Sequence, residues 1–288
     1  MRIEHARTAD IPAWLKLASE VEHLFGPMVS DPGFHSALEK NIERGTALCI
    51  REDEGSPGAP LMGGILLGYR PLKIEIDWLA VAERWRRYGV GRALMNHVLE
   101  LAQPPVEMVL LTFGEHEPGG AAARHFYESF GFQPSEVGPT NSAGKQTQVY
   151  RRVVGRTPTV RAVIQHADRY LLVQHNNKVP EHIGKWGIPG GRIDPTDPNR
   201  PATLRRELRE ELQIEVEVLR FLNTYAYRER LHHVFHVHPY STDLTIDRHE
   251  ILDHAWLTAD EVATWHAENR LHTGFELDAI TKSKQHLA

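Results

Sequence analysis

A glycine pair followed by a leucine-striped helix is the feature that most constrains the fold of this chain. Gly190 and Gly191 open the segment, and Pro201 stands where a helix favours proline in its first turn. Residues 202–212 are therefore predicted to be helical. Leucine recurs there at every fourth position, as Leu204, Leu208 and Leu212. Such a stripe buries one side of a helix, so this segment is predicted to pack against a domain core.

The same helix gathers three carboxylates on one side. Glu207, Glu210 and Glu211 stand at positions i, i+3 and i+4, so their side chains converge. Like charges this close repel one another unless a cation neutralises them, and ligation by oxygen alone favours a hard ion, Mg²⁺ or Mn²⁺. The alternative is a solvated acidic helix. Its partners would be the arginines of the same segment, Arg205, Arg206 and Arg209.

The segment from Gly190 to Ile214 resembles the Nudix box. In that pattern a glycine, five residues, a glutamate and seven residues precede Arg-Glu-(apolar)-x-Glu-Glu-x-Gly-(apolar). The matching residues are Gly191, Arg206, Glu207, Leu208, Glu210, Glu211 and Ile214. Asp197 replaces the first glutamate, eight residues rather than seven separate it from Arg206, and Gln213 replaces the closing glycine. The catalytic end of the box is intact, whereas the loop and the helix exit differ.

The resemblance implies a Nudix α/β/α sandwich over residues 159–288. Such a domain cleaves a nucleotide or another diphosphate substrate in which a nucleoside diphosphate is linked to a further moiety. The family pattern implies that Mg²⁺, or Mn²⁺, is held by Glu207, Glu210, Glu211 and the backbone carbonyl of Gly190. Bound metal would neutralise the diphosphate and lower the pKa of a bound water.

Two further roles follow from the box. Arg206 would orient Glu207 through an ion pair rather than bind metal. The general base is not fixed by the pattern. Glu207 is its first candidate and Glu250 is the next, although Glu250 reads equally as a solvated residue of the polar segment 247–250.

The loop of the box is similar to the coenzyme A diphosphatase branch of the family. The order of histidine, glycines and aspartates over residues 182–197, together with the longer loop, carries this resemblance. Trp186 is instead typical of Nudix enzymes that act on nucleotides. Coenzyme A and a nucleotide therefore both stay open as the substrate.

A second glycine motif lies in the amino-terminal half. Residues 73–81 are predicted to be a strand, and residues 91–102 are predicted to be a helix. Gly89 and Gly91 would let the backbone approach a ligand closely. The first free N–H groups of the helix form an anion site, and the nearby arginines strengthen it.

Two motifs in residues 1–153 are similar to the GNAT acetyltransferases. They are Arg86-x-x-Gly89-x-Gly91 and Ala123-x-x-Phe126-Tyr127-x-x-x-Gly131-Phe132. The resemblance implies an α/β domain with a mixed sheet, in which a V-shaped gap between two strands holds acetyl-CoA, the acyl donor for a small-molecule amine acceptor. Leu79 and Val81 would offer backbone groups to the pantetheine arm. The pyrophosphate would lie on the loop residues Arg86, Arg87, Tyr88, Gly89, Val90, Gly91 and Arg92.

The acid and base of the transfer are less well defined. Tyr127 stands where the family usually has a phenol that protonates the departing thiolate, and the alternative is an aromatic core residue. Glu75 and Asp77 alternate along the predicted strand and are candidates for the base that deprotonates the amine. Gly120 replaces a common asparagine, which puts one substrate or cofactor hydrogen bond in doubt.

Composition limits the remaining classes. The chain of 288 residues suffices for two domains, predicted at residues 1–153 and 159–288. It has neither a long apolar run nor a signal-like start, so we expect a cytoplasmic protein without membrane partners. The single cysteine, Cys49, excludes an internal disulfide framework, and the net charge of −5 gives no basic surface for bulk nucleic acid.

Two functions remain in competition. The first is a bifunctional enzyme, an N-acyltransferase fused to a Mg²⁺-dependent hydrolase. In the second, the amino-terminal domain is a sensor that binds acyl coenzyme A without turnover and regulates the hydrolase. A separate question concerns His232, His236 and His238, which alternate along a predicted strand. Both a zinc site and a solvent-facing surface are compatible with them. The amine, the diphosphate substrate and the oligomeric state stay open.

Overall fold

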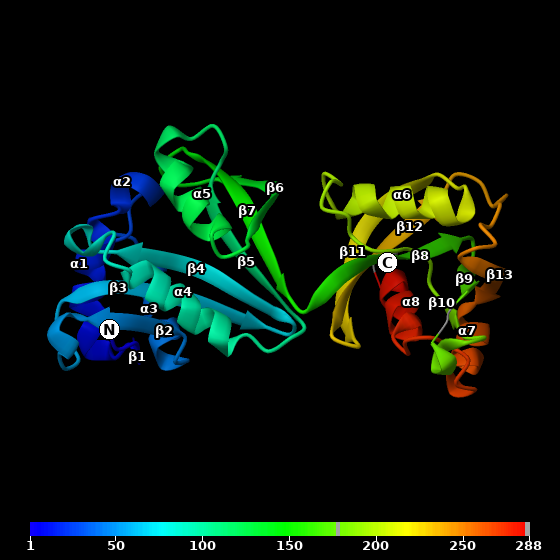
Figure 1. The fold of residues 1–288 in the computed structure, drawn as a ribbon, viewed down its shortest axis with the longest axis horizontal. Coiled ribbons are helices and arrows are strands. Elements are labelled where there is room, and N and C mark those ends of the chain that lie inside the picture. Colours follow the sequence, from blue (N-terminus) through cyan, green and yellow to red (C-terminus); the bar gives the residue numbers. More distant parts are fainter. Residues whose placement is uncertain (177–178, 286–288) are drawn as a thin grey trace. The chain divides into compact units, whose positions relative to one another are not determined.

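The computed structural model describes residues 1–176 and 179–285, which form two compact units (Figure 1). The first unit ends at Val154 and the second begins at Gly155. Each unit combines helices with a mixed sheet, so the α/β class predicted from the sequence is confirmed. None of the helices in the described residues has the length and apolar content of a membrane span.

The first unit is built on a seven-stranded sheet in the order β1-β2-β3-β4-β5-β7-β6. Its strands are β1 (Glu4–His5), β2 (Ala47–Arg51), β3 (Leu61–Arg70), β4 (Lys73–Val81), β5 (Val106–Phe113), β6 (Gln133–Thr140) and β7 (Gln146–Val154). The pair β4 and β5 runs parallel, which requires a crossover, and α4 (Val90–Leu101) makes it. The other described pairs of this sheet are antiparallel.

Helices cover both faces of this sheet. They are α1 (Ile11–Ser19), α2 (Glu22–Phe25), α3 (Pro32–Glu43), α4 and α5 (Ala121–Glu128). Leu94 of α4 and Tyr127 of α5 belong to the core on one face. Trp14 of α1 and Leu38 of α3 belong to the core on the other face. The sheet is therefore the middle layer of three, and its two cores fix β4 and the start of α4 in place.

The second unit holds a sheet in the order β10-β9-β8-β12-β11, with β13 paired to β9. Its strands are β8 (Arg156–His166), β9 (Arg169–His175), β10 (Trp186–Gly187), β11 (Val216–Tyr227), β12 (Arg230–Pro239) and β13 (Ile251–Thr258). Its helices are α6 (Arg200–Leu212), α7 (Ala259–Ala267) and α8 (Glu276–Lys284). Figure 1 shows α6 on one side of the sheet and α8 on the other. The predicted leucine stripe of α6 is fully buried against this sheet.

Two elements of the second unit begin earlier in the chain than the sequence suggested. Strand β8 begins at Arg156, ahead of residue 159 where the domain was predicted to start, because the Arg156 N–H donates to the Glu229 carbonyl at 3.0 Å and extends the pairing with β12. The helix expected from residue 202 begins at Arg200, because the Asn199 side chain accepts a hydrogen bond from the Ala202 N–H at 2.9 Å.

The alternating histidines lie on the central strand β12, between β8 and β11. His232 and His236 are buried and bond to Thr159 and Gln165. The solvent-facing interpretation is therefore wrong for these two residues, because both faces of a central strand are covered here. His238, at the end of the strand, is exposed.

The altered exit of the box predicts a stability effect. Gln213 ends α6 in the left-handed conformation, with φ 54° and ψ 34°, where a residue with a Cβ is strained by roughly 1 kcal/mol. Gln213→Gly is expected to raise the free energy of unfolding by about that amount, measured by urea titration. Gln213→Ala keeps the strain and should leave it unchanged. A glycine variant no more stable than the alanine variant would contradict the strain.

Candidate active sites

The Gly190-Gly191 turn is held in front of α6 by the edge of β8. The Val160 N–H donates to the Gly191 carbonyl at 2.9 Å. The Gly190 N–H donates to Oε2 of Glu211 at 3.0 Å. A side chain on Gly191 would collide with the Glu207 carboxylate. The turn is therefore in contact with two of the three glutamates assigned to metal.

Arg206 forms ion pairs with Glu207 and Glu210, the two more exposed carboxylates of α6. Its Nη1 lies 2.8 Å from Oε1 of Glu207 and 3.0 Å from Oε2 of Glu210. Its Nη2 lies 3.0 Å from Oδ2 of Asp197. Arg206 thus contacts Glu207, as an orienting ion pair requires, and it also holds Glu210. Asp197, which stands in for the first glutamate of the box, acts here as an anchor for Arg206.

Glu211 is the most buried carboxylate of the site, with 4% of its surface exposed. Burial raises its pKa to about 7, and the charges of Glu207 and Glu250 add to this effect while Arg161 and the Gly190 N–H oppose it. Burial also raises the pKa of Glu207, with Arg206 opposing and with Glu210 and Glu250 contributing. Negative charge is therefore crowded at this site beyond what the two arginines offset.

A distant loop brings Glu250 to the same place. The Thr245 N–H donates to the Leu212 carbonyl at 3.0 Å, and the Asp247 N–H donates to the Glu211 carbonyl at 2.9 Å. These bonds fasten the loop before β13 to the end of α6. Glu250 is exposed to solvent, and its charge raises the pKa of both Glu207 and Glu211. Glu250 is therefore close enough to act on the charge of both carboxylates.

Arg161 of β8 was not singled out from the sequence. Its Nη1 donates to the Gly190 carbonyl and approaches the Ile188 carbonyl at 3.5 Å. Burial lowers its pKa, and the charges of Glu211, Glu207 and Glu276 counter that effect. An arginine inside the apolar run 160–164 was the one available signal, because burying such a charge is costly unless a partner needs it.

The donor set agrees in chemistry with a hard divalent cation. Every proposed donor is an oxygen, and the crowded carboxylates keep unfavourable charge that a cation would offset. In the described residues no three His, Cys, Asp or Glu side chains are gathered around one point as metal ligands. Glu207 and Glu210 face Arg206, and the Gly190 carbonyl, assigned to metal from the sequence, faces Arg161. Metal ligation would require these arginine contacts to rearrange.

In the first unit, β4 and β5 part where the acyl coenzyme A gap was predicted. Their parallel pairing runs from Lys73 opposite Glu107 to Ile76 opposite Leu110 and then stops, although both strands continue. Figure 1 shows β5 and β7 turning away from β4. Among the strands that the structure describes, none therefore pairs with the carboxyl-terminal half of β4 on its β5 side.

The backbone of Leu79 and Val81 is directed to that open side. The Ala82 N–H donates to the Met62 carbonyl, toward β3, at 3.0 Å. Successive residues of a strand direct their N–H and C=O groups to opposite edges, so those of Val81 and Leu79 face away from β3. In agreement, the Val81 carbonyl accepts a hydrogen bond from Nε of Arg86 at 3.3 Å.

The predicted pyrophosphate loop leads directly into α4. Gly89 is the residue before the helix, with φ 84°, and no side chain caps the first turn. The N–H groups of Val90 and Gly91 therefore lie at an uncapped helix start, which suits an anion. Tyr88 is 66% exposed, and Arg92 lies over the Phe130 ring at 5.2 Å. Arg87 has a positive φ of 71° within the turn.

The two loop glycines have different roles. A Cβ on Gly89 would meet no atom within 4 Å, whereas a Cβ on Gly91 would lie 3.3 Å from the Phe126 ring. Close approach to a ligand is therefore a sound expectation for Gly89 only. Position 91 favours glycine because α4 packs closely against the Phe126 ring of α5.

Substitutions at these glycines are expected to separate the two roles. Gly89→Ala places a methyl group in the open space before the helix and strains the left-handed turn. It should weaken coenzyme A binding by about tenfold in isothermal titration. Gly91→Ala should instead lower the unfolding temperature more than the affinity. Equal losses of affinity in both variants would contradict this assignment.

Tyr127 and Gly120 are both explained by packing in this unit. Tyr127 is 9% exposed and packs against Phe126 and Phe132, so it is a core residue as one of the two interpretations had it. Burial raises its pKa, so the phenol keeps its proton. A side chain on Gly120 would collide with Phe113. The asparagine of the family pattern has no room here.

Asp77 is the better placed of the two candidate bases. It is the extra residue of a bulge in β4, between Ile76 and Trp78, where β4 has just parted from β5. Partial desolvation raises its pKa although the residue is exposed, and the charge of Glu75 adds to the rise. Lys73 instead lowers the pKa of Glu75 by hydrogen bonding. Asp77 is thus the stronger proton acceptor.

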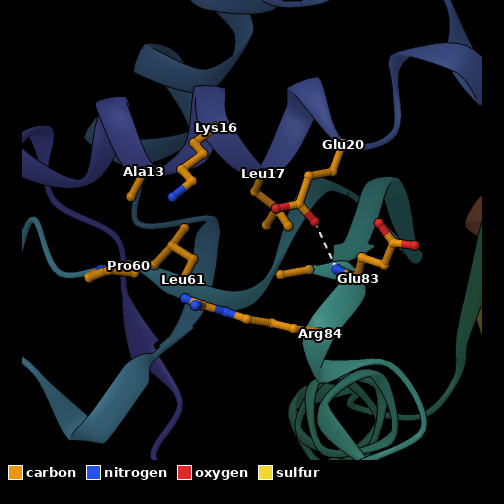
Figure 2. Close-up of a pocket in the computed structure, with 9 residues that line it drawn as sticks. Ala13, Lys16, Leu17, Glu20, Pro60, Leu61, Glu83 and Arg84 are labelled. Carbon is orange, nitrogen blue, oxygen red and sulfur yellow. Dashed lines mark hydrogen bonds between the residues drawn. The ribbon is translucent and has the colours of Figure 1, made fainter.

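A cavity of about 510 Å³ lies beside α1. Figure 2 shows the residues that line it, which the sequence did not indicate. The Glu83 N–H donates to Oε2 of Glu20 across it at 2.7 Å. Lys16 and Arg84 also line it, so its acidic and basic side chains are equal in number. It has no net charge preference, and we assign it no ligand.

Comparison with known proteins places each motif in a family domain. The model of the NUDIX domain matches residues 155–274, and the model of the acetyltransferase (GNAT) domain matches residues 43–134. The carboxy-terminal half is similar to the CTP pyrophosphohydrolase of Escherichia coli (strain K12). The two are 32% identical over 105 residues, which cover 35% of this chain and 76% of that protein.

Solved structures resemble each half separately. The MutT NUDIX hydrolase from Burkholderia pseudomallei is 25% identical, with a TM-score of 0.33, and the match covers 36% of this chain and 84% of that one. The ribosomal-protein-alanine N-acetyltransferase from Brucella melitensis is 21% identical, with a TM-score of 0.43, and the match covers 54% of this chain and 100% of that one.

Proposed function

Because the chain belongs to the Nudix family in its carboxy-terminal half and carries a GNAT acetyltransferase domain in its amino-terminal half, we propose that it is a bifunctional enzyme. One activity is the Mg²⁺-dependent hydrolysis of a nucleotide at a diphosphate bond. The other transfers an acyl group from acetyl-CoA to a small amine. We assign them to two domains, residues 1–153 and 159–288.

The contact between Glu211, Glu207 and the Gly190-Gly191 turn is the observation that carries the hydrolase proposal. A nucleotide is the favoured substrate because the Escherichia coli relative is named for the hydrolysis of CTP. Coenzyme A, which also contains a diphosphate, is the alternative. Trp186 does not decide between them, since it is buried against Trp265 in the core, with ring centroids 5.0 Å apart.

In this proposal Glu207, Glu210, Glu211 and the Gly190 carbonyl would hold Mg²⁺. The cation, when bound, neutralises charge on the diphosphate and acidifies the attacking water. Arg206 orients Glu207, and it must release Glu210 for that carboxylate to reach the ion. Glu250, on the loop fastened to α6, accepts the proton of the water. Glu207 is the other candidate for this step.

For the transferase, the exposed edge of β4 would bind the pantetheine arm through Leu79 and Val81, and Gly89 would lie beside the pyrophosphate. The amine nitrogen attacks the thioester carbonyl carbon, a proton passes from nitrogen to Asp77, and the C–S bond breaks. The departing thiolate is protonated from solvent, because Tyr127, the acid expected from the sequence, is packed in the core and its raised pKa keeps its proton. The products are an acylated amine and coenzyme A.

A sensor role for the first domain is the second candidate. The observation that favours it is Gly120, which has no side chain to make the hydrogen bond of the family's asparagine. A side chain at this position would collide with Phe113. Such a domain would bind acyl coenzyme A without consuming it. Consumption of acetyl-CoA in the presence of any amine of a broad panel would exclude this role.

One experiment tests the hydrolase and its substrate together. The full chain is incubated with Mg²⁺ and either nucleoside triphosphates or coenzyme A, and products are separated by chromatography. The proposal requires release of pyrophosphate or phosphate from a nucleotide. Appearance of 3′,5′-ADP and phosphopantetheine would favour the coenzyme A alternative. Intact substrates in every reaction would refute the hydrolase. Repeating each reaction with acetyl-CoA tests regulation.

A further inference from the structure

Three arginines lie near the Gly191 turn, one on β8, one on β12 and one directly after the turn. Arg156 and Arg230 are register partners on these two parallel strands, whose axes lie about 4.8 Å apart. Arg192 follows the turn and forms a β-bridge with Thr159 of β8. The three side chains therefore belong to neighbouring positions at one end of the sheet, next to the turn that contacts Glu207.

These positions share the face of the sheet opposite α6. Thr159 is the register partner of His232, and its Oγ1 lies 2.7 Å from Nδ1 of that ring, so both side chains are on one face. The pairing shifts register between Arg230 and His232, where β8 has one extra residue. On β12 the spacing stays at two residues, so Arg230 has the orientation of His232. Farther along this face, Val234 of β12 and Val163 of β8 belong to the core under α7 and α8. The register partner of Val234 is Arg161.

The three arginines have no acidic partner in the described part of the chain. None of the ion pairs of the second unit within residues 155–176 and 179–285 involves Arg156, Arg192 or Arg230. Burial lowers the pKa of Arg230, and the positive charges of Arg156, Arg192 and Arg161 lower it further. The positive charge here is thus concentrated and not offset.

A buried imidazole gives independent evidence for a ligand. His232 is 5% exposed, and its Nε2 has no hydrogen-bond partner within the described residues 1–176 and 179–285. A buried polar atom without a partner costs free energy, so it marks a place where a ligand atom is expected. The charges of Arg161 and of Arg230 both act on this ring, so one of the three arginines, Arg230, lies near it.

We propose that Arg156, Arg192 and Arg230 form an anion subsite for the phosphate chain of the nucleotide substrate. Guanidinium groups bind phosphate oxygens through paired N–H donors, which suits this ligand better than a single carboxylate. The carboxylates of α6 lie on the other side of the Gly190-Gly191 turn. The chain of phosphates would then cross the turn from the carboxylates to the arginines. This inference rests on the proposed nucleotide hydrolase function.

Pyrophosphate is the probe that tests the subsite, titrated calorimetrically into the full chain in EDTA. Without divalent cations the carboxylates repel the probe. The uncapped start of α4 also suits an anion, so the three arginines are reported by the part of the binding that their substitutions remove. Each of Arg156→Met, Arg192→Met and Arg230→Met is expected to weaken binding by on the order of tenfold. Arg209→Met is the matched control, because Arg209 is ion-paired to Glu215 at 2.7 Å outside the site, and it should bind as wild type.

The subsite is refuted if no arginine variant weakens binding, or if Arg209→Met weakens it equally. Circular dichroism and thermal unfolding check that each variant folds. Kinetics with a cleaved nucleotide should show a raised KM with little change in kcat. Glu211→Gln should keep pyrophosphate binding in EDTA. If no nucleotide is hydrolysed but the arginines still bind pyrophosphate, the hydrolase proposal fails and the subsite stands as an anion site.

Discussion

Glu211→Gln is expected to lower Mg²⁺-dependent hydrolysis by on the order of a hundredfold or more. The buried carboxylate accepts the Gly190 N–H at 3.0 Å and lies in the region where negative charge accumulates. The amide keeps the shape of the side chain but removes the charge that would hold the cation. Initial rates at saturating Mg²⁺, with the substrate found in the chromatographic screen, measure the effect.

Glu215→Gln is the matched control for this loss. Glu215 is exposed and pairs with Arg209 at 2.7 Å, just beyond the end of α6. Its removal changes the net charge by the same amount without touching the turn, so activity should stay within twofold of wild type, about the size of a weak surface effect. A folded Glu211→Gln protein with more than a tenth of the wild-type rate would rule out a central role for this carboxylate.

The local sequence was sufficient to predict those features that depend on a single helix, strand or motif. The strand predicted at residues 73–81 is β4, and the stripe of Leu204, Leu208 and Leu212 is fully buried on α6. Both predictions use the spacing of apolar residues within one element. The GNAT and Nudix assignments were confirmed for the same reason, because each motif is a short run of adjacent residues.

Contacts between segments far apart in the sequence could not be predicted from the spacing of residues within one element. Arg161 meets the Gly190 carbonyl because residues 189–191 pair with the edge of β8, and the sequence does not show that pairing. Gly91 read as a ligand-facing glycine, yet its neighbour is the Phe126 ring of another helix. The burial of His232 depends in the same way on which strand is central. The proposed catalytic and metal-binding roles stay predictions, since geometry alone does not test them.

The same Glu211→Gln substitution is expected to stabilise the fold at pH 8 when no divalent cation is added. Burial raises the pKa of Glu211 from 4.5 to about 7 in the folded protein. Between these pH values the folded state keeps a proton that the unfolded state releases. The contribution of Glu211 to the free energy of unfolding is therefore fully present below pH 4.5. It is lost as the pH rises through 7, and the loss amounts to about 3 kcal/mol. Glutamine has no such proton to lose.

Urea unfolding in EDTA at pH 4.5 and pH 8 measures this difference. The two proteins should have similar free energies of unfolding at pH 4.5, and the variant should be more stable at pH 8 by about 3 kcal/mol. Added Mg²⁺ should narrow the gap by binding the wild-type site. Glu215→Gln should show no gain, because Arg209 lowers the pKa of that exposed carboxyl. A variant no more stable than wild type at pH 8 would mean that burial does not disfavour the ionised form of Glu211.

Lower activity combined with higher stability would instead show that the buried carboxylate is needed for hydrolysis although its charge lowers the free energy of unfolding.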